Sequence, residues 1–275
     1  MSAVYRNFSQ AELDAAYNNR AAEHGLDAIK DDWERRSKAL YARTRVDRDL
    51  AYGSGARQRL DFFRAPSKGR PTVAWIHGGY WQTNEKEPNA FIAEGLLAHD
   101  LNVALVEYTL APAASMSAIV AEIRASVGWL VARLQPEFGA SRRLVVAGHS
   151  AGGHLTAMSA GLPGVGGAMP VSGLFDLEPI RLSYLNAAVK MDLGEAGANS
   201  PLNLPLPSIP MSVVVGGAEL PELVRQSEDY AAALAAAGRQ VRKVVVPKAT
   251  HFTILEEVAR PSGSLAMEAA RLAEM

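Results

Sequence analysis

The sequence of 275 residues contains no cysteine. This absence excludes disulfide bonds, thiolate nucleophiles and zinc sites with cysteine ligands. It identifies no cellular compartment, because a chain without thiols is compatible with any redox environment. If the protein uses nucleophilic catalysis, the nucleophile must therefore be a hydroxyl group rather than a thiol.

An excess of charge of either sign is also missing. The chain has 28 Lys and Arg residues against 29 Asp and Glu residues, which gives a formal net charge of −1. It contains no block of like charges that would form an acidic or basic tail. Because binding of nucleic acid requires a basic surplus or a basic face, nucleic acid is not the expected partner. A small neutral or weakly charged molecule is the expected substrate.

Long uninterrupted apolar segments are rare as well. Residues 1–8 contain no apolar run of signal-peptide length. Residues 155–175 carry no charge over 21 residues and meet the length criterion for a membrane span. Because this stretch contains five glycines and two prolines, we interpret it as a helix end, a turn and a buried strand. The sequence therefore predicts a cytoplasmic protein that does not bind membranes.

The sequence does contain a regular alternation of apolar runs and helical patterns. Runs that are apolar on both faces are typical of strands buried on both sides, as in a parallel sheet covered by helices. The predicted strands span residues 50–52, 58–63, 73–76, 103–106, 144–147, 168–171, 211–215 and 241–246, and helical patterns cover residues 88–99, 117–134, 221–237 and 252–259. This order predicts an α/β fold with a doubly wound, mostly parallel sheet of about eight strands.

No repeat, linker or shift in composition divides the chain, so residues 1–275 are expected to form a single domain. Residues 1–45 are predicted to be helical. A capping box of Ser9 and Glu12 begins the first helix, and Gly25 is its expected end. Residues 176–210 are expected to form a cap-like insertion that folds over the site.

The segment Gly148-His149-Ser150-Ala151-Gly152 is the most informative motif. It follows the apolar run 144–147 and precedes a helix of small residues, which is the context of a nucleophile elbow. Such a turn exposes the Ser150 hydroxyl, and the two glycines leave room for the neighbouring strand and helix. The helix N-terminus also favours negative charge that develops there. The alternative is a Gly-rich connection without chemistry.

A second glycine-rich segment, His77-Gly78-Gly79-Tyr80-Trp81, follows the strand predicted at residues 73–76. Acyl transfer requires two backbone N–H groups that converge on the oxyanion. We expect one from Gly79 or Tyr80, with Gly78 as a further candidate, and the other from Ala151. Tyr80 and Trp81 are predicted to line the substrate pocket together with His149, although both aromatic residues could belong to the core. His77 is expected to bond locally and hold the loop.

A catalytic base and an acid are expected downstream of Ser150, in the chain order Ser, acid, His. His251 is the only histidine well beyond Ser150, and it follows the last predicted strand. The turn after residues 211–215 offers Glu219 and Glu222 as the acid. We favour Glu219, because it lies in the turn itself, whereas Glu222 follows a proline and would complement a helix dipole. The histidine spacing indicates no metal site.

These segments resemble the esterase and kynurenine formamidase (arylformamidase) group of the α/β-hydrolases. The similarity also includes residues 17–20, 52–53, 171–177 and 217–227, so it extends over nearly the whole chain. It implies an α/β-hydrolase fold, a triad of Ser150, Glu219 and His251, and no metal or organic cofactor. Formamidases of this group often have Asp as the acid, whereas the turn here offers only Glu.

The sequence therefore predicts a serine hydrolase that cleaves a small-acyl ester or an aryl-formamide and is either a carboxylesterase or similar to kynurenine formamidase. A non-catalytic binding protein with the same fold would be expected to lack a triad member, and none is missing. A lipase that acts on longer acyl chains would be expected to have an amphipathic basic helix, and none is evident. The sequence leaves open whether the protein forms homo-oligomers.

Overall fold

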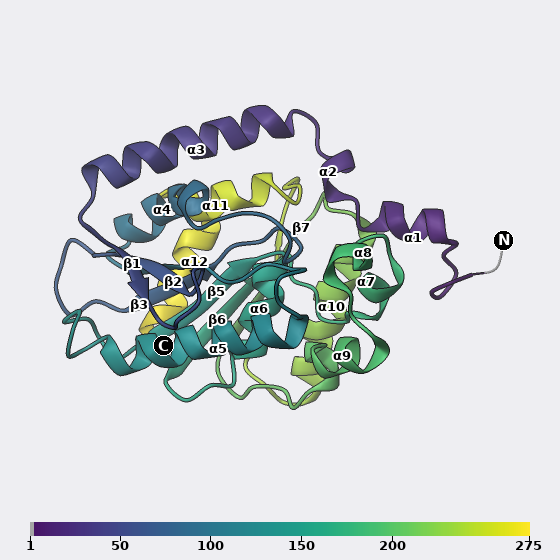
Figure 1. The fold of residues 1–275 in the computed structure, drawn as a ribbon. Helices are drawn as coiled ribbons and strands as arrows, with labels where there is room; N and C mark the ends of the chain where they lie inside the picture. The colour runs from purple at the N-terminus through teal and green to yellow at the C-terminus, as the bar shows by residue number, and fades with distance from the viewer. Residues whose placement is uncertain (1–2) are drawn as a thin grey trace.

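A mixed β-sheet of eight strands forms the centre of the computed structural model, which describes residues 3–275 (Figure 1). The strands are β1 (Val46–Ala51), β2 (Arg59–Phe63), β3 (Thr72–Ile76), β4 (Asn102–Val106), β5 (Leu144–His149), β6 (Val165–Val171), β7 (Met211–Gly216) and β8 (Val241–Val246). Their order is β1-β2-β4-β3-β5-β6-β7-β8. β2 is antiparallel to both of its neighbours, and the other pairs are parallel. The predicted α/β fold is therefore confirmed.

The central strands are buried on both faces because alternate residues enter two different parts of the core. In β3, Val73 and Trp75 pack on one side of the sheet, whereas Ala74 and Ile76 pack on the other. All four side chains are at most 1% exposed. A strand with an apolar residue at every position can satisfy both faces only when helices cover both of them, which explains the continuous apolar runs of the sequence.

Helices cover both faces of the sheet (Figure 1). Residues of α3 (Leu26–Arg43), α4 (Ala93–Ala98), α11 (Glu256–Ala259) and α12 (Ser264–Glu274) belong to the core on one face. Residues of α5 (Met116–Arg133), α6 (Ala151–Ser159) and α10 (Pro221–Ala236) pack on the other face. The chain also forms three short 3-10 helices, η1 (Glu87–Ile92), η2 (Pro201–Asn203) and η3 (Thr253–Leu255). Residues at the ends of the central strands therefore lie between two helical layers.

The N-terminal helices differ from the sequence expectation. The capping box of Ser9 and Glu12 is present and begins α1 (Gln10–Ala16). That helix ends at Ala16, and a separate short helix, α2 (Asn19–Ala22), follows. The prediction of one helix ending at Gly25 is therefore wrong. The side chain of Asn18 accepts a hydrogen bond from the Ala21 N–H at 3.2 Å and caps the new helix, which explains the interruption.

The uncharged stretch 155–175 has the predicted structure of a helix end, a turn and a strand, supplied by α6 and β6. None of the helices within residues 3–275 is long and apolar enough to span a membrane. After β6, three short helices, α7 (Glu178–Leu182), α8 (Asn186–Val189) and α9 (Leu193–Ala198), form the segment that precedes β7. Tyr184 and Leu185 of this segment reach the cavity described below.

Candidate active site

Ser150 lies on the sharp turn between β5 and α6, as the motif predicts. Its backbone has φ 57° and ψ −118°, a region that non-glycine residues rarely adopt. The Ser150 N–H donates a hydrogen bond to the carbonyl oxygen of Val171 on the neighbouring strand at 2.8 Å. This bond anchors the turn to the sheet while Ser150 itself lines a cavity.

The two glycines that flank Ser150 are required by close packing around the turn. A Cβ atom on Gly152 would lie 2.0 Å from the carbonyl oxygen of Ile76, at the end of β3. A Cβ atom on Gly148 would lie 2.6 Å from the same oxygen. Any side chain at either position would push β3 and α6 apart, so the motif reflects the geometry of this junction.

His251 lies in the loop after β8 and is bonded to Glu219, which follows β7. The distance between His251 Nδ1 and Glu219 Oε2 is 2.6 Å, and the Glu219 side chain is fully buried. The other carboxylate oxygen of Glu219 accepts the Gly216 N–H at 2.7 Å and the hydroxyl group of Ser172. Because a carboxylate accepts at Nδ1, this nitrogen carries the ring proton, and Nε2 of His251 is left to accept one.

Glu222, the other candidate acid, faces a different set of partners. Its two oxygens accept bonds from Arg225 at 2.8 and 2.7 Å, and one of them accepts the Tyr17 hydroxyl at 3.2 Å. Burial favours a higher pKa for Glu222, but the bonds and charge of Arg225 outweigh it and lower the pKa. The structure thus brings Glu219, and not Glu222, to His251.

The loop that begins at His77 lies directly against the nucleophile turn. A Cβ atom on Gly78 would be 2.8 Å from the carbonyl oxygen of His149 and 3.0 Å from Cβ of Ser150. Within residues 3–275, the N–H groups of Gly78, Gly79 and Tyr80 donate no hydrogen bond. The N–H of Ala151, the first residue of α6, has no acceptor within its own helix. Unused amide donors therefore lie on both sides of Ser150.

His77 holds this loop, as expected for a residue with local bonds. It is buried, with Nδ1 at 2.8 Å from the Gly78 carbonyl oxygen and Nε2 at 3.0 Å from Glu107 Oε1. Its ring stacks on Tyr108, with the centroids 4.5 Å apart. These contacts of His77 lie outside the cavity and fix the position of Gly78.

The prediction that Trp81 lines the pocket is wrong. Tyr80 lines the cavity, but Trp81 is 0% exposed and belongs to the hydrophobic core. Both residues have a left-handed backbone, with φ 48° and 60°, and consecutive side chains on this turn point in different directions. The ring of Trp81 instead meets His154 of α6 edge-on, with the centroids 5.1 Å apart.

A cavity of about 440 Å³ joins the predicted site residues. Ser150, His251, Gly78, Gly79, Tyr80 and His149 all line it. Glu219 lies behind His251, and Ala151 lies in the first turn of α6. The cavity is thus formed where the strands β3, β5 and β8 end, the position that parallel sheets of this type use for ligands.

Sequence reasoning allowed that the N-terminal helices contribute to the site, but it identified none of the residues that they supply to the cavity wall. Asn19 and Arg20 of α2, and Lys30 and Trp33 of α3, line the same cavity as Ser150. Gln82, Asn84 and Phe252 also do so. Arg20 lies in the segment that carries the resemblance, but helical periodicity alone gives no indication of which residues face a cavity that is distant in the sequence. Ser172, also in a matching segment, was missed as a partner of Glu219.

The His149 ring lies beside the His251 ring, with the ring centroids 4.5 Å apart. Burial lowers the pKa of His149 well below its usual range, and the adjacent His251 lowers it further. His149 therefore stays uncharged near neutral pH. As a result, a positive charge that forms on His251 during a reaction is not repelled by a second histidine cation.

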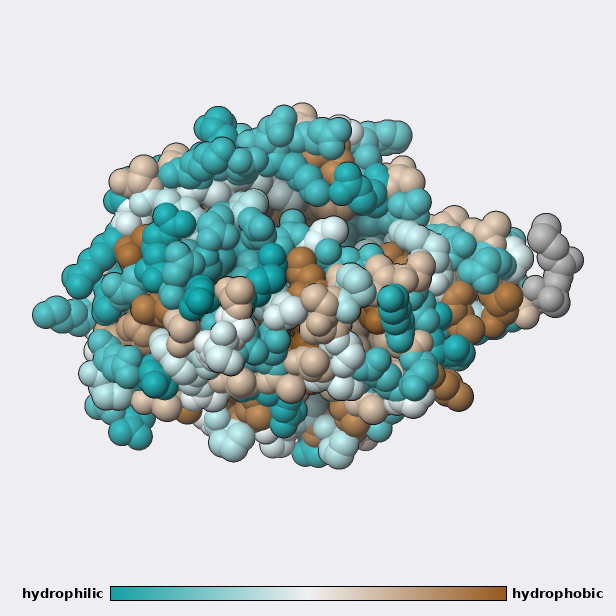
Figure 2. Space-filling model, viewed as in Figure 1, coloured by the Kyte–Doolittle hydropathy of each residue, from teal (hydrophilic) through white to brown (hydrophobic). Residues whose placement is uncertain are grey.

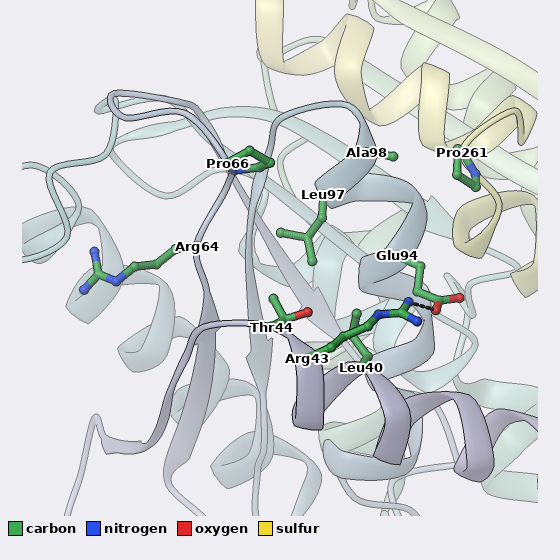
Figure 3. Close-up of a pocket in the computed structure, with 9 residues that line it drawn as sticks. All are labelled: Leu40, Arg43, Thr44, Arg64, Pro66, Glu94, Leu97, Ala98 and Pro261. Carbon is green, nitrogen blue, oxygen red and sulfur yellow. Dashed lines mark hydrogen bonds and ion pairs between the residues drawn. The ribbon is translucent and has the colours of Figure 1, made fainter.

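A second hollow, of about 500 Å³, lies at the C-terminal end of α3 beside α4 (Figure 3). Its lining includes Leu40, Leu97 and Pro66, and an ion pair between Arg43 and Glu94 spans part of it. Its lining contains one hydroxyl group, that of Thr44, and no histidine. This hollow therefore lacks a nucleophile paired with a histidine base, which acyl transfer by a hydroxyl group requires. Groups of three or more His, Asp or Glu side chains that could hold a metal ion are also absent from residues 3–275.

Comparisons with known proteins identify relatives of the chain and structures with the same fold. The family model described as BD-FAE matches residues 60–165, a span that includes Gly78 and Ser150. The kynurenine formamidase of Danio rerio is 34% identical over 226 residues, which cover 76% of this chain and 76% of the relative. A crystal structure from Silicibacter sp. TM1040, provisionally called a thioesterase, has a TM-score of 0.84 and 29% identity and covers 93% of this chain and 98% of its own. An esterase from Pyrobaculum calidifontis has a TM-score of 0.75 and 20% identity, with 98% and 99% coverage.

Proposed function

The chain belongs to the kynurenine formamidase family of α/β-hydrolases and is itself a hydrolase, and we propose that it cleaves a small-acyl ester or an aryl-formamide through an acyl-enzyme on Ser150. The observation that carries this proposal is the 2.6 Å contact between His251 Nδ1 and Glu219 Oε2, beside a strained serine that lines the same cavity as His251.

In the proposed first step, Ser150 Oγ forms a bond to the substrate carbonyl carbon while Nε2 of His251 takes the hydroxyl proton. Glu219 stays ionised and accepts a hydrogen bond from the Nδ1–H group throughout, which keeps the ring in one tautomer and stabilises the imidazolium. His251 then gives its proton to the departing alcohol or amine. A water molecule attacks the acyl-enzyme, with His251 again as base, and the acid product leaves with Ser150 restored.

The negative charge on the tetrahedral oxygen needs donors that are not used elsewhere. The free N–H groups of Gly79 and Tyr80, with Gly78 as a further candidate, and that of Ala151 are proposed to supply them. Loss of one such donor typically costs about 3 kcal/mol of transition-state stabilisation. The start of α6 at Ala151 adds the favourable end of a helix dipole.

The substrate is proposed to carry its aromatic or apolar part beside Tyr80. Residues 176–210, which contribute Tyr184 and Leu185 to the cavity, are proposed to act as a cap that restricts its size. Both N-formylkynurenine and short aryl esters meet these requirements. Action in the cytoplasm, formation of homo-oligomers and the organisation of residues 1–275 as a single domain stay predictions.

Labelling with a fluorophosphonate probe tests the nucleophile. We expect the wild type to be labelled at Ser150 and Ser150→Ala to lose both the label and hydrolysis, by on the order of 10⁴-fold or more. Ser67→Ala is the matched control, because Ser67 is exposed and belongs neither to the cavity lining nor to residues 176–210. Equal labelling of wild type and Ser150→Ala would refute the proposal, and an unlabelled wild type would favour a non-catalytic protein.

Rates with N-formylkynurenine, p-nitrophenyl acetate and p-nitrophenyl butyrate separate the substrate classes. A formamidase should cleave N-formylkynurenine with a kcat/KM at least comparable to its kcat/KM for p-nitrophenyl acetate. Hydrolysis of the two esters alone would indicate a carboxylesterase. A rate that rises steadily through longer acyl chains would instead favour the lipase alternative.

A further inference from the structure

Two cationic side chains lie at the edge of the cavity that contains Ser150. Arg20 comes from α2 and Lys30 from the first two turns of α3. Both helices precede β1 in the chain, and α3 crosses the molecule above α4 and α11 (Figure 1). The outer surface along α3 is mainly hydrophilic (Figure 2). We refer to Arg20 and Lys30 together as the cationic rim.

The cationic rim has no acidic partner among residues 3–275, unlike the other cations of α3. Those cations all form ion pairs: Arg35 with Asp32, Arg36 with Glu256, Lys38 with Glu34, and Arg43 with Glu94. Glu34 is the only acidic residue in the cavity lining, and Lys38 already neutralises it at 2.6 Å. The lining therefore carries two cations that form no ion pair within residues 3–275, against a single carboxylate that already has a partner, and its charge is positive.

The two cations also act on each other. Lys30 is only partly exposed, and burial lowers its pKa; the charge of Arg20 lowers it further, against a smaller opposite effect of Asp27. Like charges held together at the edge of a cavity repel, and an anion between them would relieve that repulsion. Apart from the cationic rim and from Glu34, which pairs with Lys38, the polar lining consists mainly of neutral groups such as Asn19, Gln82 and Thr83.

We propose that Arg20 and Lys30 select substrates that carry a carboxylate on the leaving group, which projects from Ser150 toward α2 and α3. This inference rests on the proposed function, because it assumes that the scissile carbonyl lies at Ser150. It narrows the expectation of a small neutral or weakly charged substrate: the net charge of the chain is close to zero, but two cations line this cavity. Arg20 and Lys30 are then specificity residues and take no part in proton transfer.

A pair of acetate esters with equal shape tests the proposal. One is 3-(4-acetoxyphenyl)propanoate, whose leaving group carries a carboxylate, and the other is its uncharged carboxamide. The measured quantity is the ratio of the two kcat/KM values, because the ratio cancels changes in the amount of folded enzyme. We expect the wild type to prefer the carboxylate by about 10-fold, and Lys30→Met and Arg20→Gln each to reduce that ratio by about 3- to 10-fold.

Arg35→Met is the matched control, because it removes one positive charge from α3 at a position that is 71% exposed and outside the cavity lining. We expect it to keep the wild-type ratio within about 2-fold. In the wild type, added salt should lower the ratio toward 1, since exposed charges are screened. This second measurement does not depend on the folding of any variant.

The outcomes separate the two proposals. If the wild type cleaves the carboxamide in a Ser150-dependent way but shows no preference for the carboxylate, the cationic rim is not a specificity site. An equal ratio in wild type, Lys30→Met and Arg20→Gln leads to the same conclusion. If neither ester is cleaved, or Ser150→Ala cleaves both as fast as the wild type, the proposed function itself fails.

Discussion

The cavity has two walls that are built in different ways. The sheet-end wall consists of groups that follow the strands, chiefly Ser150, His149 and His251, each at most 6% exposed. The helical wall comes from α2 and α3 and includes Arg20 and Lys30, which are exposed and partly exposed. On the sheet-end wall the acid behind His251 accepts three hydrogen bonds, whereas the cations of the helical wall have no partner among residues 3–275.

The difference follows from what each wall is proposed to do. Proton transfer and oxyanion binding need groups fixed to a fraction of an ångström, and backbone bonds at strand ends supply that precision. Recognition of a charge at the cavity edge tolerates motion, because Coulomb attraction varies slowly with distance. A free cation on a flexible side chain is sufficient there. Changes in the sheet-end wall should therefore affect kcat, and changes in the helical wall should affect selectivity.

The largest expected effect comes from Glu219→Gln on the sheet-end wall. Glutamine can no longer hold the His251 ring in one tautomer or stabilise its cation, so kcat should fall on the order of 10³- to 10⁴-fold. The same variant also loses a charged acceptor for Ser172 and the Gly216 N–H. Steady-state kinetics with p-nitrophenyl acetate measure the loss, and far-UV circular dichroism verifies the fold.

Glu222→Gln is the matched control, three residues along the chain. It loses the paired bonds to Arg225, so we expect a destabilisation of about 1–2 kcal/mol but a kcat within about 10-fold of wild type. A kcat that collapses in Glu222→Gln and survives in Glu219→Gln would reassign the acid. It would also mean that the contact at 2.6 Å between Glu219 and His251 does not serve the reaction.

An intermediate effect is expected when the pH is lowered, which should destabilise the fold through His154 of α6, the helix that begins next to Ser150. His154 is fully buried in α6, and its Nε2 donates to the Asn199 carbonyl oxygen at 2.8 Å. Burial lowers the pKa of His154 from 6.5 to about 4, with the bond to Asn199 opposing this. Between these two values the unfolded chain binds the proton and the folded chain does not, so stability falls as the pH drops from about 6.5 to about 4.

Urea unfolding at pH 7.5 and pH 5 measures this effect. His154 should account for about 2 kcal/mol of the stability lost between the two, by linkage from its lowered pKa. In His154→Gln the loss should be smaller by that amount, since glutamine does not titrate and can still donate to Asn199. His24→Gln, at an exposed position, should keep the wild-type difference. An unchanged difference in His154→Gln would contradict the prediction.

Much of the fold could be predicted from the sequence, and the sheet-end wall more fully than the helical wall. Apolar runs identify strands because each face of the sheet must be filled, and a residue such as Ser150 follows its strand by a fixed number of positions. The same reasoning identifies His251 and Glu219 as residues that follow strands. It cannot reach Lys30, because the position of α3 depends on packing between residues far apart, such as Trp33 and Phe91, whose rings stack at 4.7 Å. The burial of Trp81 is not predictable for a related reason, since it depends on packing of the ring against His154 of α6, which is distant in the sequence.

The smallest expected effect concerns Tyr80, where the two walls meet. It tests whether the sheet-end wall and the helical wall act independently at this contact. The Tyr80 hydroxyl donates to the Tyr17 carbonyl oxygen at 2.7 Å and accepts from Asn19 Nδ2 at 3.0 Å, so it joins the oxyanion loop to the N-terminal helices. Tyr80→Phe removes both bonds but keeps the ring and the backbone N–H. We expect a loss of about 1–2 kcal/mol in the free energy of unfolding.

For Tyr80→Phe, kcat for a neutral ester should stay within about 3-fold of wild type, because the backbone amide proposed as an oxyanion donor is unchanged. Tyr80→Ala supplies the comparison, since loss of the ring opens the cavity and should raise KM as well. If Tyr80→Phe lowers kcat by more than about 100-fold, comparable to the loss of an oxyanion donor, the helical wall must help to set the position of the oxyanion loop. The division of the cavity into a catalytic wall and a selective wall would then be wrong at this contact.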